Sequence, residues 1–287
     1  MRLHVLKTHK LFIGGKFPRS ESGRVLPVIS ETGTHLANIS HASRKDVRDA
    51  VTAARKGADA WKGATAYLRS QIIYRLAEML ESRAGDMAAE ISAATGARPA
   101  AAAAEVSAAV DRLVHLAGWP DKLTQVFGSV NPVAAPFFNF STLEPTGVVV
   151  VFAPDAPALM AAVSLIGTAL AAGNACILVA SERYPTPITS LTECLATSDL
   201  PAGAVNVLTG LRAELAPCVA GHHDIDAVLD ASGIPALAKV LAEGAAVNLK
   251  RVYSWGAVDW NLPASSASPY QILDLTETKT TWHPVAV

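Results

Sequence analysis

Apolar positions in the first half of the chain recur every three or four residues, which is the period of an amphipathic helix. The pattern predicts a helix that begins after Ser43, where Asp46 three residues on completes a capping box. A second helix carries an apolar stripe from Leu68 to Met87, and a third covers about residues 100–116. We expect these three helices to form one layer.

From residue 145 onward the pattern changes to short runs that are apolar throughout, separated by helical segments. Strands of this kind, alternating with helices, indicate a parallel sheet covered on both faces, which is a Rossmann-like α/β fold. Ligands of such sheets bind beyond the carboxyl ends of the strands. The predicted strands are 148–152, 175–180, 205–208 and 225–229, and the helices between and after them start near Pro157, Pro187, Arg212 and Gly233.

Two segments depart from this alternation. Residues 125–144 place phenylalanines among Gly, Asn and Pro, which predicts a hairpin-like excursion. Residues 262–269 have the composition of a linker, and 270–287 have the pattern of one extended strand. Because a lone strand is not stable unaided, we expect the tail to pair with a sheet, in this chain or in another subunit.

Composition narrows the class of protein. Hydrophobic residues make up 51% of the 287 residues, charged residues 17%, and the net charge is -1. That balance is globular and gives no reason to expect nucleic acid or an anionic membrane as a partner. The weakly charged stretch 146–180 is interrupted by Pro154, Pro157 and Gly173, so we expect a protein core and not a bilayer span. The basic start of the chain lacks the apolar run of a secretory signal.

Three cysteines without CxxC spacing predict neither a disulfide scaffold nor a zinc site, so a reducing cytoplasm is the expected location. Cys218 and His222 could form a thiolate–imidazole pair at i and i+4. The apolar context of Cys218 favours a structural role instead. The sequence His222-His223-Asp224 resembles a metal cluster, and a turn is the favoured interpretation.

Several motifs, in chain order, resemble those of the aldehyde dehydrogenase superfamily. The segment LFIGGKF at 11–17 resembles its INGKF turn, and EPTGVVVVFAPDAP at 144–157 is similar to E-P-x-G-V-V-x-x-I-x-P-W-N-F-P. ALAAGNACILVASE at 169–182 and DLPAGAVNVLTG at 199–210 resemble two further family motifs. The tail LTETKTTW at 275–282 resembles the family's terminal strand, which joins a neighbouring subunit's sheet.

This resemblance implies a division of the chain. Residues 1–124 and 145–262 would form an NAD-binding-like αβα domain, and 125–144 with 263–287 a small β extension for oligomerisation. The family's catalytic domain would be absent. Within the superfamily, the chain is most similar to the nucleophile-lacking second half of tandem two-domain aldehyde dehydrogenases.

The resemblance also exposes departures at the catalytic positions. No cysteine follows Cys218, and residues 251–260, which correspond to the E-L-G-G region, contain no glutamate. Asp155 stands where the family has its oxyanion-stabilising asparagine, and a carboxylate there would repel a developing oxyanion. We therefore expect no catalytic residue in this chain. An acid–base pair of Asp155 with Glu182 is the alternative.

The positions that would hold a dinucleotide are altered as well. The family's ribose-binding lysine corresponds to Val179, although its glutamate partner is retained as Glu182. A glycine that lets the adenine approach a helix corresponds to Arg212. The F-T-G-S segment corresponds to residues 230–233, which include Ser232 and Gly233. Asp155 and Asp230 would face a pyrophosphate with negative charge. No cofactor is expected, and residual NAD(P) binding is the alternative.

These observations predict a pseudoenzyme that acts as a structural or regulatory subunit of a homo- or hetero-oligomer with an aldehyde dehydrogenase. Three alternatives stay open. The chain could be an NAD(P)-dependent aldehyde oxidoreductase acting with a partner subunit, a nucleotide-binding sensor, or a degraded gene product without a selected role.

Overall fold

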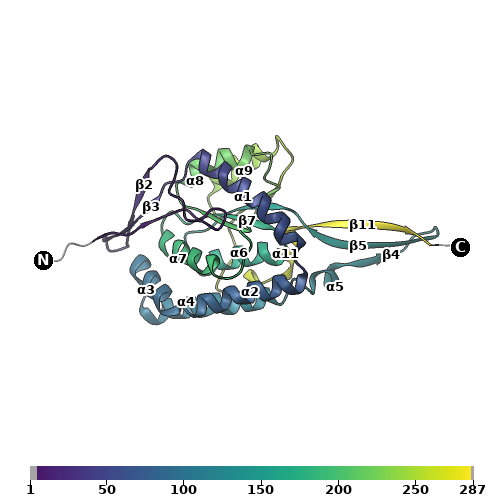
Figure 1. Ribbon diagram of the computed structural model, residues 1–287, viewed down its shortest axis with the longest axis horizontal. Coiled ribbons are helices and arrows are strands. Elements are labelled where there is room, and N and C mark those ends of the chain that lie inside the picture. The colour runs from purple at the N-terminus through teal and green to yellow at the C-terminus, as the bar shows by residue number, and fades with distance from the viewer. Residues whose placement is uncertain (1–4, 286–287) are drawn as a thin grey trace.

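A five-stranded, fully parallel sheet lies at the centre of the molecule (Figure 1). The computed structural model describes residues 5–285. The strand order is β10-β9-β6-β7-β8. Its strands are β6 (Val148–Phe152), β7 (Ala175–Val179), β8 (Val205–Leu208), β9 (Ala227–Asp230) and β10 (Arg251–Ser254). The Rossmann-like fold class expected from the sequence is confirmed.

Helices cover both faces of this sheet. On one face lie α1, α8 and α9, and on the other lie α6 and α7, which are covered in turn by α2, α3 and α4 (Figure 1). The helices are α1 (Arg44–Gly63), α2 (Ala66–Glu81), α3 (Ala84–Thr95), α4 (Pro99–Ala117), α5 (Leu123–Phe127), α6 (Met160–Ala171), α7 (Pro185–Ala196), α8 (Arg212–Gly221), α9 (Pro235–Ala245), α10 (Pro263–Ser266) and α11 (Pro269–Asp274).

The expectation of a single layer of N-terminal helices is wrong in one respect. The α1 helix packs on the sheet face opposite to α2, α3 and α4. Its predicted capping box is present, because the Ser43 hydroxyl accepts from the Asp46 N–H while the Asp46 carboxylate accepts from the Ser43 N–H. The predicted second helix is two helices, since α2 ends at Glu81 and Met87 lies in α3.

Two smaller sheets flank the body. Near the N-terminus, β1 (Thr8–His9), β2 (Val25–Ile29) and β3 (His35–Ser40) form a sheet of order β1-β3-β2. At the other end, β4 (Ser129–Asn131), β5 (Phe137–Pro145) and β11 (Thr276–Pro284) form an antiparallel sheet that projects from the body (Figure 1). We call this three-stranded sheet the arm.

The tail is not the single strand that the sequence predicted. Residues 269–274 form α11, whose N-cap is Ser268 with Pro269 at the first helical position, and β11 follows. Strand β11 pairs over its whole length with β5 of the same chain. Residues 1–4 of the predicted αβα domain and residues 286–287 of the predicted tail lie outside the described residues.

Buried polar side chains attach the arm and the linker to the body. The fully buried Asn174 accepts from the Gly147 N–H at 2.8 Å and donates to the Leu275 carbonyl at 2.8 Å. The buried Arg112 guanidinium donates to the Ser164 hydroxyl and to both oxygens of Ser266. The predicted linker is therefore held firmly against α4 and α6.

No helix within residues 5–285 is both long enough and apolar enough to cross a bilayer.

Close backbone packing fixes the distance between α1 and the sheet. A side chain at Gly57 would place its Cβ 2.2 Å from the Gly203 carbonyl carbon. Gly203 itself has a φ of +90°, and a Cβ there would lie 2.2 Å from the Ala53 carbonyl oxygen. Two glycines therefore allow α1 to touch the loop before β8.

Replacing Gly57 with alanine is expected to destabilise the fold by about 1–3 kcal/mol, because the added methyl group overpacks a backbone contact. Gly63→Ala is the matched control, since it lies in the same helix and a methyl group added there would meet no atom within 4 Å. There alanine should be neutral or should stabilise by up to about 1 kcal/mol. Chemical denaturation measures both changes; equal effects at the two positions would contradict the packing argument.

Candidate functional site

The strand order places the candidate site at the carboxyl ends of β6 and its neighbours. Strand β7 lies on one side of β6 and β9 on the other, and α6 and α9 leave the sheet on opposite faces. Open parallel sheets bind their ligands in the crevice at such a reversal of strand order. The polar residues predicted for cofactor binding lie in the loops after β6, β7 and β9.

Arg212 crosses this edge of the sheet. It is the first residue of α8, after β8, and its side chain is 3% exposed. Its Nη2 donates to the Ala153 carbonyl at 2.8 Å and to Asp155 Oδ1 at 2.7 Å, both in the loop after β6. Nε is enclosed and makes no hydrogen bond to a described residue. A guanidinium that has lost its water in this way depends on Asp155 for charge compensation.

Asp155 is held by two donors at once. Its Oδ1 accepts from Arg212 and, at 2.7 Å, from the hydroxyl of Ser181 after β7. Burial would raise the pKa of the Asp155 carboxyl, but hydrogen bonds from Arg212 and Ser181 outweigh it and hold that pKa below its ordinary value. The carboxylate is therefore ionised at neutral pH and engaged by its own chain.

Glu182 joins the same cluster from the loop after β7. Its Oε1 accepts from the backbone N–H of Arg212 at 2.6 Å, so it caps the first turn of α8, where a negative charge is favourable. Asp155 and Glu182 thus contact opposite ends of one arginine. Val179 is fully buried as the last residue of β7 and presents no polar group to the edge.

The loop after β9 is closed by its own hydrogen bonds. Asp230 Oδ1 accepts from the Ser232 N–H at 2.9 Å and from its hydroxyl at 2.6 Å. Gly233 has a φ of +70°, and its Cα lies 2.7 Å from where a Cβ of Gly256 would stand. The backbone that follows β10 therefore packs beside Gly233, while the first residues of α9 stay exposed.

The remaining candidates have structural partners. Burial raises the pKa of the Cys218 thiol, whose sulfur contacts the Arg44 carbonyl. The His222 ring accepts at Nδ1 from the Asp224 N–H at 3.2 Å, a bond between neighbours in the chain. Within the described part of the chain, no three His, Cys, Asp or Glu side chains come together as a metal ion would require.

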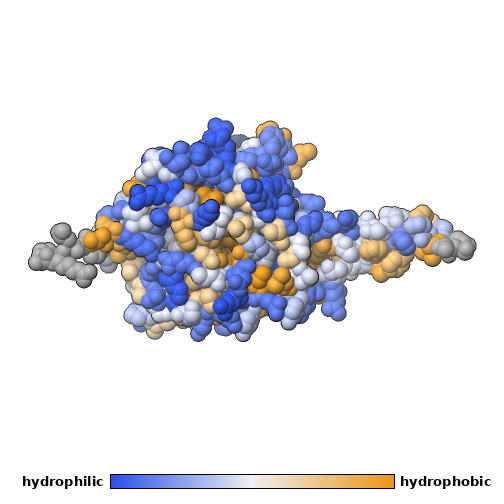
Figure 2. All heavy atoms as spheres, viewed as in Figure 1, coloured by the Kyte–Doolittle hydropathy of each residue, from blue (hydrophilic) through white to orange (hydrophobic). Residues whose placement is uncertain are grey.

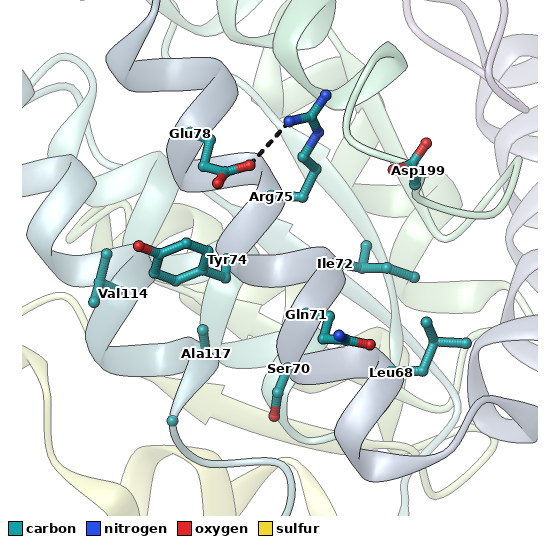
Figure 3. Close-up of a pocket in the computed structure, with 11 residues that line it drawn as sticks. Leu68, Ser70, Gln71, Ile72, Tyr74, Arg75, Glu78, Val114, Ala117 and Asp199 are labelled. Carbon is teal, nitrogen blue, oxygen red and sulfur yellow. Dashed lines mark hydrogen bonds and ion pairs between the residues drawn. The ribbon is translucent and has the colours of Figure 1, made fainter.

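A separate groove of about 860 Å³ lies on the outer surface of α2 and α4 (Figure 3). Leu68, Tyr74 and Val114 supply apolar walls, and the Arg75–Glu78 ion pair of 2.9 Å lies along α2. None of the residues predicted for cofactor binding lines this groove.

A model described as the aldehyde dehydrogenase family matches residues 17–255, most of the chain up to the end of β10. The chain belongs to the aldehyde dehydrogenase family.

Two relatives within this family are about 30% identical to the chain over the region that they share with it. DhaS of Bacillus subtilis (strain 168) is 30% identical over 250 residues, which are 85% of this chain and 50% of that protein. Aldehyde dehydrogenase, cytosolic 1, of Elephantulus edwardii is 31% identical over 251 residues, or 85% and 49% of the two chains. The chain spans about half the length of these aldehyde dehydrogenases.

Solved structures of aldehyde dehydrogenases also match the chain over about half of their length. An NAD+ complex of an aldehyde dehydrogenase from Bacillus cereus is 27% identical, with a TM-score of 0.81 over 86% of this chain and 50% of that one. An NAD-dependent aldehyde dehydrogenase from Sinorhizobium meliloti is 25% identical, with a TM-score of 0.80 over 87% and 50%.

Two of these structures are of NAD-dependent or NAD+-bound aldehyde dehydrogenases. In this chain, the residues at the carboxyl edge of the sheet do not fit a bound NAD. Arg212 and Asp155 fill the edge beside β6, and Val179 offers no donor. At the start of α9, where a phosphate would need free N–H groups, Pro235 has none and the Ile234 N–H donates to the Ser232 hydroxyl at 3.2 Å.

Arg212 and Ser181 were missed as site residues by the sequence prediction. The charges of the neighbouring residues are the signal that could have predicted a role for Arg212. Arg212 stands where the resemblance implies a glycine, and it contacts two carboxylates, Asp155 and Glu182, whose like charges it separates.

Asp155→Asn is expected to lower the free energy of unfolding by about 1–2 kcal/mol at pH 7, because it leaves an enclosed guanidinium without a carboxylate, reduced here by the partial exposure of Asp155. The pKa of Asp155 is lowered in the fold, so its stabilisation is present above the unfolded-state value and is lost as pH falls through the folded-state value. The difference between wild type and variant should therefore be constant near neutrality and shrink below about pH 4.

Denaturant titrations at several pH values measure this difference. Asp49→Asn is the control, because Asp49 forms an exposed pair with Lys45 on α1 and should contribute little. A loss of stability that is the same at every pH would contradict the charge-based role of Asp155.

Proposed function

We propose that this chain is a non-catalytic, structural or regulatory subunit that assembles through the arm, with an aldehyde dehydrogenase or with further copies of itself. The observation that carries the proposal is the arm itself, which extends away from the folded body (Figure 1). Assembly through the arm would remove its exposed apolar side chains from water, which is favourable.

Aromatic side chains are exposed on both faces of the arm. Trp282 is 58% exposed and packs edge-on against Phe137, with ring centroids 5.8 Å apart. On the other face, Phe138 is 46% exposed beside Phe140. Figure 2 shows apolar residues along the arm among polar ones. Exposed aromatic groups of this kind are typical of a surface that another polypeptide covers.

The edge of the arm supports the same proposal. In the order β11-β5-β4, the nine-residue strand β11 is paired on one side only within the described chain. A long unpaired edge offers a row of backbone donors and acceptors that a strand of a partner can use. Inside the arm, Asn131 of β4 donates to Asn139 and Ser141 of β5, so these two strands hold a fixed register.

Asp155 supports the non-catalytic part of the proposal. In the family motif this position is an asparagine that donates to an oxyanion, whereas here an ionised carboxylate already binds Arg212. A carboxylate would disfavour the negative charge that develops in acyl chemistry. Residues 251–260 also contain no glutamate that could act as a base.

We also propose a subfamily, an assembly unit and a cellular location for the chain. The chain is closest to the nucleophile-lacking half of tandem aldehyde dehydrogenases, with 125–144 and 263–287 as its assembly unit, and it acts in the cytoplasm. The name of the cytosolic relative from Elephantulus edwardii is consistent with that location.

Trp282→Lys combined with Phe138→Lys is expected to abolish assembly or to weaken it more than tenfold, because lysine charges would have to be buried at the interface. Point variants are preferable to removal of residues 270–287, since the fully buried Leu275 belongs to the body. Size-exclusion chromatography with light scattering reads the mass of the purified chain, alone and mixed with an aldehyde dehydrogenase captured from the native source.

The matched control is Tyr67→Lys, which changes an aromatic residue that is 67% exposed on α2. It should leave the mass unchanged. If the double variant assembles like wild type, the arm is not the interface. NADH formation with a panel of aldehydes, by the chain alone or in the complex, would instead support the oxidoreductase alternative.

A further inference from the structure

The side chain of Arg212 lies at the carboxyl edge of the sheet. We propose that Arg212, with Asp155, Ser181 and Glu182, permanently fills the crevice in which sheets of this type bind a dinucleotide. The chain therefore does not bind NAD+ or NADP+ there, and its fold is stable without either. This inference does not depend on whether the arm assembles.

Arg212 lies across the carboxyl edge of the sheet. Arg212 starts after β8, its backbone N–H is bound by Glu182 after β7, and its guanidinium reaches the carbonyl of Ala153 after β6. One residue thus contacts the loops at the carboxyl ends of three adjacent strands through its backbone and its side chain. A ligand in the crevice would have to lie where this side chain lies.

Displacing the Arg212 side chain from this position would cost free energy. The guanidinium is enclosed and shares a 2.7 Å ion pair with Asp155. Separating the pair leaves the buried guanidinium without its partner, which is unfavourable unless the incoming group replaces its contacts, whereas the partly exposed Asp155 carboxylate would regain water. A dinucleotide would bring phosphates toward Arg212, but it would also meet the carboxylates of Asp155 and Glu182.

On the opposite side of the crevice, the N-terminus of α9 could bind a phosphate only through free backbone N–H groups. Pro235, the first residue of α9, has no N–H. The Ile234 N–H donates to the Ser232 hydroxyl at 3.2 Å, and the Ser232 N–H donates to Asp230 Oδ1 at 2.9 Å. This exposed end of α9 therefore offers a phosphate few free donors.

The decisive experiment is a calorimetric titration of the wild-type chain with NAD+ and with NADP+, accompanied by thermal unfolding in millimolar concentrations of each. We expect no saturable heat and no shift in Tm. The aldehyde dehydrogenase from Bacillus cereus, whose structure contains NAD+, serves as the positive control under the same conditions. A saturable isotherm for the wild-type chain would overturn the proposal.

A double-mutant cycle tests the filling role of the arginine. Arg212→Ala should lower Tm clearly, whereas Arg75→Ala, on the exposed surface of α2, should not. The double variant Arg212→Ala/Asp155→Asn should lose less stability than the two single changes together, since neither charge is then left alone. Strict additivity, or a stable Arg212→Ala chain whose Tm equals that of wild type, would show that Arg212 is not a structural occupant of the crevice.

Discussion

A parallel sheet that is buried on both faces leaves only its strand ends for polar chemistry. Every residue of β6 and β7 is inaccessible to solvent or nearly so, because α1, α8 and α9 cover one face and α6 and α7 the other. All charged groups that approach this sheet must therefore enter at its edges. The cluster around Arg212 lies at the carboxyl edge for this reason. Because ligands of such sheets bind at this edge, the side chains of the cluster determine what the fold can bind.

Sequence patterns predicted the elements whose burial is complete. The central strands were found because a strand covered on both faces is apolar at every position. The boundary between α2 and α3 was not found, because Leu76, Leu80 and Met87 keep a helical phase across a break that contains neither glycine nor proline. The short helix α11 was missed although Ser268-Pro269 carries the usual signal for a helix start.

The candidate site shows a different limit. Sequence alone placed Asp155, Glu182 and Ser232 near one edge, because the carboxyl ends of parallel strands lie together. It did not predict that Asp155 and Glu182 would be joined by Arg212, since that depends on the direction in which one side chain leaves the first turn of α8. Charge complementarity between distant segments is visible only after the strand order is known.

The pairing of the arm has a consequence for biosynthesis. Strands β5 and β11 are neighbours in the fold, yet the residues at their base are far apart in the chain; Asn174 and Leu275, which fasten this base, are separated by 101 residues. While a ribosome makes the intervening sheet, β5 has no partner on that side and its phenylalanines are open to other chains. The arm is therefore completed only after the central sheet has been made, and the nascent chain exposes the phenylalanines of β5 before β11 has emerged.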